Sequence, residues 1–253
     1  GSMGDDGSGL ALGLSVGGRT ALMDRICVAR TIAPPNVFPA GIIVNSAGQR
    51  FINEDAYAFI VGEKVAEQPG SGRAWLILES RDFWTALKQS FFPGSGLFLM
   101  WGAPALINVF LGGTRGASTL EGVATKCGVD ASGLRRSLEA YNAIACGSKQ
   151  DPLGKFPELL KPIESGPFYA VNMSLGNKFG PAQTFTLGGL AVDETDGTIT
   201  RADGSRIEGL YAAGRVAVGL CSQGYMSGLS IADTVFSGRR AGRPRTRPRY
   251  SRV

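Results

Sequence analysis

Two short apolar runs in the first half of the chain have the length and the boundaries of β-strands. Gly41–Asn45 (GIIVN) lies between the turns at Pro34-Pro35 and Ser46–Gly48, and Ala74–Leu78 (AWLIL) is bounded by charged residues. Short apolar runs between turn or charged residues are typical of strands. The pattern therefore predicts a strand at each run.

Residues 118–146 predict two consecutive helices. Ser118 stands in a cap-like position before the first helix, and Asp130 stands before the second. Side-chain oxygens at such positions accept hydrogen bonds from the first backbone amides of a helix. The second helix repeats apolar residues at helical spacing, at Leu134, Leu138, Tyr141 and Ile144. We therefore expect Tyr141 to lie in the core and to take no part in catalysis.

The longest apolar stretch is Leu97–Leu111 (LFLMWGAPALINVFL), inside a segment without charge between Lys88 and Arg115. Fifteen residues interrupted by Gly102 and Pro104 are too few to span a bilayer as one helix. The favoured interpretation is a helix buried in a cap domain. The alternative is an exposed apolar surface, either an entrance for a lipophilic substrate or a membrane contact.

The last third of the chain has a different pattern. Leu187–Asp193 reads LGGLAVD and predicts a strand, and the turn pairs Asp196-Gly197 and Asp203-Gly204 predict a small antiparallel ribbon. Gly209–Arg215 (GLYAAGR) predicts a buried strand that ends in a tight glycine turn. A helix is expected from Ser227 to Gly238 or beyond, and residues 4–18 predict a loop leading into a short helix.

Charge is concentrated at the C-terminus. The net charge is +5, and the seven arginines of residues 239–253, with no acid among them, leave −2 for the rest. A nearly neutral body gives no basic face for nucleic acid. We interpret the Arg-Pro pattern of residues 243–253 as a basic disordered tail.

Histidine is absent from the chain, which excludes Ser-His-Asp and Cys-His catalysis, histidine metal sites and histidine-linked flavin. The four cysteines are Cys27, Cys127, Cys146 and Cys221; they are far apart and form no CxxC pair, so no metal site is predicted. Dispersed thiols fit a reducing compartment, and we expect a cytoplasmic protein, with membrane association left open by the apolar stretch.

Five sequence elements occur in an order that resembles fumarate-reductase-type flavoproteins, a family that includes 3-ketosteroid dehydrogenases. They are GDDGSG at 4–9, RFINED at 50–55, TLGGLAVD at 186–193, GLYAAGR at 209–215 and SGLSIADTVFSGRRAG at 227–242. The resemblance covers nearly the whole chain.

The resemblance implies a fold and a cofactor. The fold class is α/β with an α+β cap, and the implied architecture is an incomplete two-domain flavoprotein. Residues 4–30 and 171–242 would form parts of the FAD-binding domain, and residues 31–170 the cap or substrate domain. Non-covalent FAD would contact the following residues: Ser8, Gly9, Gly214, Arg215, Gly228, Leu229, Ser230 and Ile231. A glycine turn lets the backbone approach phosphate, and a helix start favours negative charge on the flavin.

The chain departs from the family in one respect. The family's strand–GxGxxG–helix segment, which cradles the FAD phosphates, has no counterpart here. We therefore expect a fragment, or one half of a split protein, whose binding of FAD without a partner is doubtful. The implied partner is a second copy or a separate N-terminal FAD-binding polypeptide.

The substrate class follows from Phe185. Phe185 is the first residue of the segment FTLGG. Fumarate reductases carry a histidine at the matching position, in an HTMGG-like motif. Phenylalanine in a chain without histidine suits an apolar ligand, a 3-ketosteroid or a similar hydrophobic ketone, better than a dicarboxylate.

Three further residues match the 3-ketosteroid Δ4-(5α)-dehydrogenase group. The resemblance implies that Tyr225 binds the ketone oxygen and that Ser227, with Tyr57 as a proton relay, accepts the α-proton. Hydride would pass to flavin N5. Two alternatives remain: a fumarate-reductase-like enoate reductase, and a catalytically incomplete fragment that serves as a binding or interaction subunit. We interpret Arg50 and Glu54 as a structural ion pair, of modest effect if exposed.

Overall fold

The computed structural model describes residues 6–30, 36–91, 102–147, 150–180 and 182–243. The chain divides into two compact units. The smaller unit comprises Gly1–Cys27 and Thr184–Val253, and the larger unit comprises Val28–Gln183. The second division falls after Gln183 and not after residue 170, because the strand that crosses residue 170 is an inner strand of the larger unit's sheet. The assignment of the units to FAD and substrate binding stays a prediction.

The larger unit is built on a four-stranded antiparallel sheet in the order β3-β4-β6-β5. Its strands are β3 (Ile42–Asn45), β4 (Ala74–Glu79), β5 (Thr114–Ala117) and β6 (Phe168–Asn172). The two predicted strands are therefore confirmed as β3 and β4. Its helices are α2 (Ala58–Ala66), α3 (Pro69–Gly72), α4 (Ser80–Phe91), α5 (Ala103–Asn108), α6 (Leu120–Cys127) and α7 (Ala131–Ala145), with short helical turns η1 (Phe38–Ala40), η3 (Val109–Gly113) and η4 (Pro157–Leu159).

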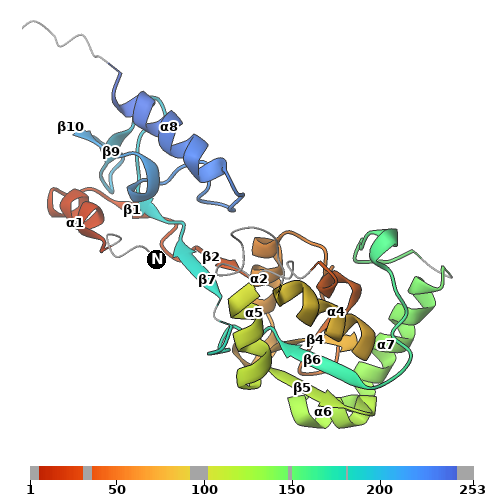
Figure 1. Cartoon of the computed structure of the whole chain (residues 1–253). Helices are drawn as coiled ribbons and strands as arrows, with labels where there is room; N and C mark the ends of the chain where they lie inside the picture. Colours follow the sequence, from red (N-terminus) through yellow and green to blue (C-terminus); the bar gives the residue numbers. More distant parts are fainter. Residues whose placement is uncertain (1–5, 31–35, 92–101, 148–149, 181, 244–253) are drawn as a thin grey trace, which may run out of the picture. The chain divides into compact units, whose positions relative to one another are not determined.

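Helices cover both faces of this sheet (Figure 1). Alternate strand residues point to opposite sides, so Ile43 and Leu76 pack with α2 and α4, while Ile42 and Ile77 pack with α6 and α7. Every residue of β3 is buried as a result. Strands buried on both faces appear in sequence as continuous apolar runs, which is why both were predictable.

The structure shows where each of the two helices predicted within residues 118–146 begins. Asp130 caps α7 by accepting hydrogen bonds from the backbone N–H groups of Ser132 (3.2 Å) and Gly133 (2.9 Å), as expected. The cap of α6 is Thr119, whose Oγ1 accepts from Gly122 N at 3.1 Å, so the predicted cap at Ser118 is wrong by one residue. Tyr141 is buried, and its predicted place in the core is confirmed.

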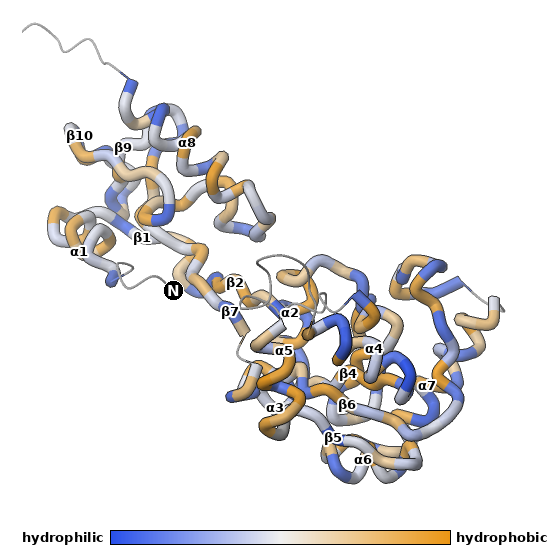
Figure 2. The backbone as a smooth tube through the Cα atoms, in the orientation of Figure 1, coloured by the Kyte–Doolittle hydropathy of each residue, from blue (hydrophilic) through white to orange (hydrophobic). Residues whose placement is uncertain are grey.

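The apolar stretch Leu97–Leu111 is described only from residue 102. Helix α5 and the π-helical turn η3 contain this part, and Figure 2 shows its hydrophobic positions. No residue of α5 is buried, and the side chains of Phe110 and Leu111 are 64% and 58% exposed. The favoured prediction of a buried helix is therefore wrong for residues 103–111, because the neighbouring elements leave this side of α5 and η3 uncovered. Within the described part of the chain, no helix combines the length and the apolarity that crossing a membrane requires.

The described residues of the smaller unit form one long helix, one shorter helix, one short helical turn and pairs of short strands. Its elements are α1 (Ser8–Ser15), β1 (Thr20–Ala21), β8 (Gly189–Leu190), β9 (Thr198–Thr200), β10 (Arg206–Tyr211), η5 (Gly214–Val216) and α8 (Leu229–Ala241). β1 pairs with β8 and β9 with β10, both antiparallel, and β2 (Ile26–Ala29) pairs with β7 (Gln183–Thr186) where the chain passes between the units.

Several expectations for the smaller unit are met. The helix α1, the β9–β10 ribbon and the helix α8 all occur, and Gly204 has a φ of +84° in the ribbon's turn. Two expectations are wrong. The strand expected over Leu187–Asp193 is reduced to Gly189–Leu190, and Gly209–Tyr211 of β10 is not buried, because α8 and η5 cover too little of the ribbon.

Candidate functional site

A small cavity in the smaller unit brings together five of the predicted site residues. They are Phe185, Gly214, Arg215, Tyr225 and Ser230, and the cavity has a volume of about 150 Å³. The residues come from β7, from η5, from the loop after η5 and from the first turns of α8. The remaining lining residues are Thr186, Leu187, Ala217, Cys221, Ser222, Asp233 and Thr234.

Three side chains form an aromatic and cationic stack in this cavity. The rings of Phe185 and Tyr225 meet edge to face, with their centroids 4.8 Å apart and their planes at 82°. The guanidinium carbon of Arg215 lies 5.4 Å from the centroid of Phe185, a distance at which the ring face attracts a cation. Phe185 therefore contacts both the guanidinium of Arg215 and the ring of Tyr225.

The phenol of Tyr225 meets the first turn of α8. Its oxygen lies 3.3 Å from Oγ of Ser230, within hydrogen-bonding distance. The same helix face holds the glycine turn, because Gly214 N donates to Oγ of Ser237 at 2.9 Å. Gly214 has a φ of +63°, which a residue with a side chain adopts only with strain. Helix α8 thus positions both Tyr225 and the glycine turn.

Asp233 is a buried carboxylate at the cavity wall. Its Oδ1 accepts a hydrogen bond from Leu220 N at 3.3 Å, and a Cβ added to Gly219 would lie 2.3 Å from Oδ2. The loop therefore approaches the carboxylate closely because residue 219 has no side chain. Burial, together with the negative charge of Asp233, raises the pKa of the Cys221 thiol.

The sequence argument missed Asp233 and Thr234 as site residues. Both lie one turn after Ser230, so they share its helix face, and this spacing is the signal that would have identified them. Thr234 Oγ1 donates to the carbonyl oxygen of Ser230 at 2.8 Å. Nothing in the sequence indicates that a loop closes over Asp233.

The start of α8 has the features expected for binding negative charge. Gly228 precedes the helix with a φ of +87°, and as a glycine it contributes no side-chain cap to the first backbone amides. The partial positive charge of a 13-residue helix is concentrated at such a start. The predicted cofactor residues Gly228 and Ile231 line a neighbouring groove along α8 and not the small cavity, and Leu229 is the first residue of the helix.

The other predicted residues lie outside the cavity lining. Ser8 and Gly9 begin α1, where Ser8 N donates to Asp6 Oδ1 at 2.9 Å and a Cβ on Gly9 would lie 2.9 Å from Val216 Cγ2. Tyr57 belongs to the larger unit, where it precedes α2, is 37% exposed and has its ring centroid 5.3 Å from that of Phe59. Ser227 lies in the loop just before Gly228. The roles proposed for these residues stay predictions.

Arg50 and Glu54 form the expected ion pair, and it is buried. The Arg50 guanidinium bonds both carboxylate oxygens of Glu54 (2.9 and 2.8 Å) and both of Asp151 (2.8 and 3.0 Å). Lys155 Nζ lies 3.2 Å from Glu54 Oε2 and 3.2 Å from the Tyr141 hydroxyl. The four charged side chains are at most 8% exposed, so the condition under which a modest effect was expected, exposure of the pair, is not met.

Burial and charge shift several pKa values in this cluster. Burial lowers the pKa of Lys155 and raises that of Tyr141 to about 12. Burial alone would raise the pKa of Asp151, but hydrogen bonds from Arg50 and from backbone amides hold it below its ordinary value. The charges balance within the cluster, which favours a structural role. Among the described residues, no group of three or more cysteines and acids has the arrangement of a metal site.

The small cavity fits part of FAD but not the whole molecule. Pockets that enclose drug-sized ligands measure about 300–1,000 Å³, and this one has about 150 Å³. Its hydroxyl groups, the guanidinium of Arg215 and the start of α8 suit an electron-rich ring edge with oxygen acceptors. The cavity therefore has room for part of a dinucleotide, and its role in binding FAD stays a prediction.

Comparisons with known proteins identify a family and several relatives of this chain. A family model described as an FAD binding domain matches residues 3–229. A 3-oxo-5-alpha-steroid 4-dehydrogenase of Comamonas testosteroni is 38% identical over 214 residues, which are 85% of this chain and 40% of that protein. An NADH:fumarate oxidoreductase of Klebsiella pneumoniae is 26% identical over 247 residues, 94% of this chain and 24% of that protein.

A solved structure is similar over nearly the whole chain. It is the 3-ketosteroid-delta4-(5alpha)-dehydrogenase of Rhodococcus jostii RHA1 in complex with 4-androstene-3,17-dione, with a TM-score of 0.74 and 29% identity. The match covers 94% of this chain and 44% of that one. The chain therefore spans less than half the length of these relatives.

Proposed function

We propose, since the chain belongs to the FAD binding domain family, that it forms part of an FAD-dependent dehydrogenase whose substrate is a hydrophobic ketone of the 3-ketosteroid class. Family membership confirms the predicted resemblance and the predicted cofactor class. The observation that supports the choice of substrate is the contact between Phe185 and Tyr225, an apolar ring beside a phenol at the first turn of α8.

Tyr225 has the chemistry to bind a ketone oxygen. Its hydroxyl lies at the start of α8, where Ser230 orients it through the 3.3 Å contact. A hydrogen bond to the ketone oxygen stabilises the negative charge that develops there when an α-proton leaves. Phe185 packs against the Tyr225 ring and excludes water from one side of it.

The proton acceptor in this proposal is Ser227, with Tyr57 as the proton relay. Neither role depends on histidine, which the chain lacks. The substrate loses a proton from its α-carbon and a hydride from its β-carbon, and a carbon–carbon double bond forms between them. FAD, when bound, supplies the hydride acceptor.

The test begins with a visible absorption spectrum of the purified chain after addition of FAD and removal of free cofactor. If flavin is retained, turnover of a saturated 3-ketosteroid with an artificial electron acceptor is measured next. Tyr225→Phe should lower kcat by about 100-fold or more, the usual cost of losing one such donor. Tyr211→Phe, on β10 and outside the cavity, is the matched control and should change kcat less than about twofold.

Two outcomes would contradict the proposal. Reduction of fumarate without steroid turnover would favour the enoate reductase alternative, to which Arg215 gives a carboxylate-binding cation. A colourless protein that also fails to bind the steroid would favour the interaction-subunit alternative.

A further inference from the structure

Helix α5 and the turn η3 are attached to the larger unit through a polar side chain. Asn177 Nδ2 donates to Asn108 Oδ1 at 2.8 Å and to the carbonyl oxygen of Asn172 at 2.9 Å. Asn177 is buried, and Val109, the residue after Asn108, packs against the core. A Cβ at Gly113 would overlap Asn108 Oδ1, so the π-helical turn closes tightly over the same amide. The inner side of this segment is therefore fixed by hydrogen bonds as well as by packing.

The outer side of the same segment is apolar. Ile107, Phe110 and Leu111 are 46%, 64% and 58% exposed, and spacings of three and four residues place them together on the helix surface. These three side chains are the α5 surface. A segment oriented only for stability would bury them, because burial of apolar side chains stabilises a fold more than burial of a hydrogen-bonded amide does. Contiguous exposed apolar side chains of this kind mark an interaction surface.

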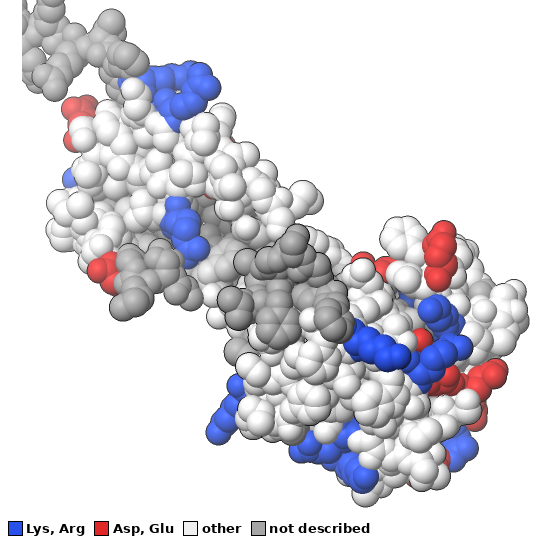
Figure 3. Space-filling view, viewed as in Figure 1, with Lys and Arg blue, Asp and Glu red and all other residues white. Residues whose placement is uncertain are grey.

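The elements that contact this segment carry exposed basic side chains and no exposed acid. They are α4, β5, β6 and the segment 173–180, which hydrogen-bonds α5. The one acid within these described elements is Asp82, which is buried. Figure 3 shows the red side chains of the larger unit gathered toward α7, away from α5. The same elements contribute four exposed basic side chains, those of Arg81, Lys88, Arg115 and Lys178.

We propose that the α5 surface binds the boundary between headgroups and acyl chains of an anionic lipid bilayer. Phenylalanine, leucine and isoleucine side chains enter that boundary, and basic side chains beside them attract anionic headgroups. A six-residue helix followed by a five-residue turn has the length to lie in the boundary and is too short to cross the bilayer. Binding of this kind requires neither FAD nor steroid, so it is independent of the proposed function.

Other occupants fit the α5 surface less well. In a two-fold pair of chains the same patch meets itself, so the basic side chains beside it would approach those of the second copy. A small ligand needs a concave site, whereas Phe110 and Leu111 are each more than half exposed and project from the segment. An anionic lipid surface satisfies both the apolar side chains and the charge. A second copy and coverage by another part of the chain are outcomes that the test separates from lipid.

The experiment places the environment-sensitive fluorescent amino acid Anap at Phe110 of the full chain. The chain is mixed with phosphatidylglycerol vesicles, with and without a doxyl quencher on the acyl chains. We expect the emission to shift to shorter wavelength on addition of vesicles and the doxyl group to quench it. The matched control is Anap at Phe156, which is 62% exposed in the same unit and should show neither change.

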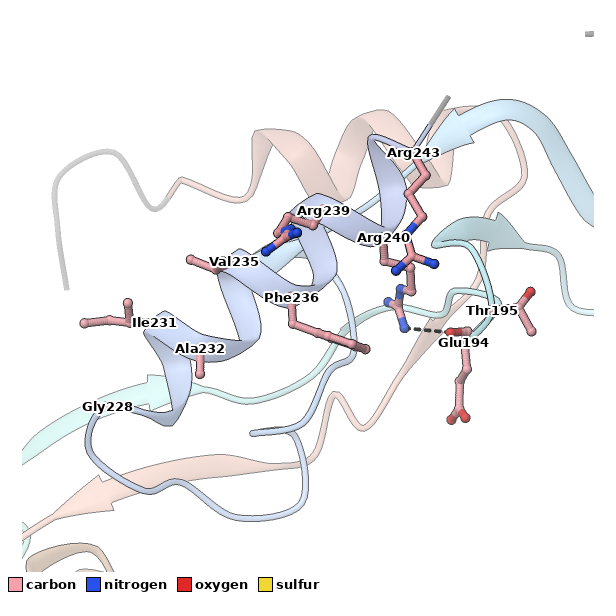
Figure 4. A pocket seen from close by; sticks show the side chains of 10 residues that line it. All are labelled: Glu194, Thr195, Gly228, Ile231, Ala232, Val235, Phe236, Arg239, Arg240 and Arg243. Carbon is pink, nitrogen blue, oxygen red and sulfur yellow. Dashed lines mark hydrogen bonds between the residues drawn. The ribbon is translucent and has the colours of Figure 1, made fainter. Parts of the chain in front are cut away.

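A second exposed apolar surface of the chain provides a sharper comparison. On α8, Val235 and Phe236 are 55% and 53% exposed, and arginines follow them along the helix (Figure 4). Because this surface also combines apolar and basic side chains, it is the rival site for an anionic bilayer. Quenching of Anap at Phe236 but not at Phe110 would overturn the proposal.

Substitutions test the apolar contribution. Ile107→Ser with Leu111→Ser should lower co-sedimentation with the vesicles by about tenfold, because two apolar side chains no longer enter the lipid. Val235→Ser with Phe236→Ser on α8 should change it less than about twofold if that helix stays outside the lipid. All four side chains are exposed, and circular dichroism of each variant checks that the fold is retained.

A further pair of substitutions tests the charge. Lys88→Gln with Lys178→Gln should lower vesicle binding by about tenfold and reduce its dependence on salt, because basic side chains near an anionic surface strengthen binding. Arg135→Gln with Arg136→Gln is the matched control. It removes the same charge from exposed positions of α7 and should change binding less than about twofold.

Four results would overturn the proposal. They are an absence of binding to the vesicles, binding without a change at Phe110, a spectral shift at Phe110 that grows with protein concentration before lipid is added, and an emission already shifted in the dilute chain. The third result would indicate a second copy, and the fourth would show that another part of the chain covers the α5 surface. Vesicle binding as expected, without steroid turnover, would count against the proposed function alone.

Discussion

The two units of this chain differ in how completely they bury their apolar residues. The larger unit packs 14 and 15 buried residues on the two faces of one sheet, whereas the smaller unit, which holds the candidate site, has a cluster of five. Each fully buried aliphatic side chain contributes about 1.5–3 kcal/mol. Among the described residues, the larger unit therefore has much the larger hydrophobic core.

The polar groups differ in the same way. In the larger unit Arg50, Glu54, Asp151 and Lys155 are buried together and neutralise one another. In the smaller unit, polar groups line an open cavity and a groove, where Arg215 and Arg240 have aromatic rings as neighbours. One arrangement stabilises a fold, and the other is available to a ligand or a partner.

The largest effect is expected from Glu54→Ala. The substitution leaves the buried cations Arg50 and Lys155 with one carboxylate between them, and removing one partner of a buried ion pair typically costs about 3–5 kcal/mol. Urea unfolding followed by the fluorescence of Trp75, which packs in the larger unit's core, measures the loss.

The matched control for Glu54→Ala is Glu67→Ala. Glu67 pairs with Lys64 on the surface, with both side chains about half exposed, so its removal should cost no more than about 1 kcal/mol. Equal effects of the two substitutions would show that the buried cluster does not hold the larger unit together.

The next largest effect is expected from shortening a buried isoleucine of the larger unit to alanine, compared with the same change at an exposed isoleucine of the smaller unit. Ile77→Ala removes a fully buried side chain from the middle strand β4 and should cost about 2–5 kcal/mol. Ile231→Ala on the exposed face of α8 should change the free energy of unfolding by less than about 0.5 kcal/mol. A large loss at Ile231 in the isolated chain would mean that the α8 face is already covered, by a second copy or by the same chain.

The sequence predicted those elements whose signals are local. Asp130 identified the start of α7, continuous apolar runs identified β3 and β4, and the segment from Ser227 predicted α8, which begins two residues later at Leu229. Prediction from the sequence failed where the burial of a segment depends on which other elements pack against it. The side chains of α5 and η3 are as apolar as a core helix, but nothing in the local pattern shows that Ile107, Phe110 and Leu111 are exposed.

The candidate site was predictable in part for the same reason. Motif positions such as Gly214, Tyr225 and Ser230 converge on one cavity. Asp233 joins them through a loop that folds back because Gly219 leaves space, which is a tertiary contact. The burial of Arg50 and Glu54 likewise depends on Asp151 and Lys155, about a hundred residues away.

A smaller effect is expected from pH. Because Arg50 holds the folded-state pKa of Asp151 below the unfolded value of about 3.9, Asp151 contributes stability that is present above that value and is lost as the pH falls through the folded pKa. Asp151→Asn should therefore flatten the fall in stability of the larger unit below about pH 4. Thermal melts between pH 2.5 and 6 measure it, with Asp24→Asn, at an exposed side chain of the smaller unit, as the control. An unchanged acid limb in Asp151→Asn would contradict the assignment.

The last and smallest expected effect is measured on the unsubstituted protein. Each unit contains a cysteine whose rate of alkylation shows how readily that unit unfolds. Cys127 is buried in the larger unit, and burial raises its pKa to about 12, while the pKa of Cys221 in the smaller unit is raised by burial and by Asp233. Thiolates are the reactive species, so both should be alkylated more slowly by iodoacetamide than the exposed Cys146. As urea is added, Cys221 should become reactive before Cys127, since a thinly packed unit opens at lower free energy. Mass spectrometry of the alkylated peptides measures the order, and simultaneous exposure of both thiols would show that the two units unfold as one.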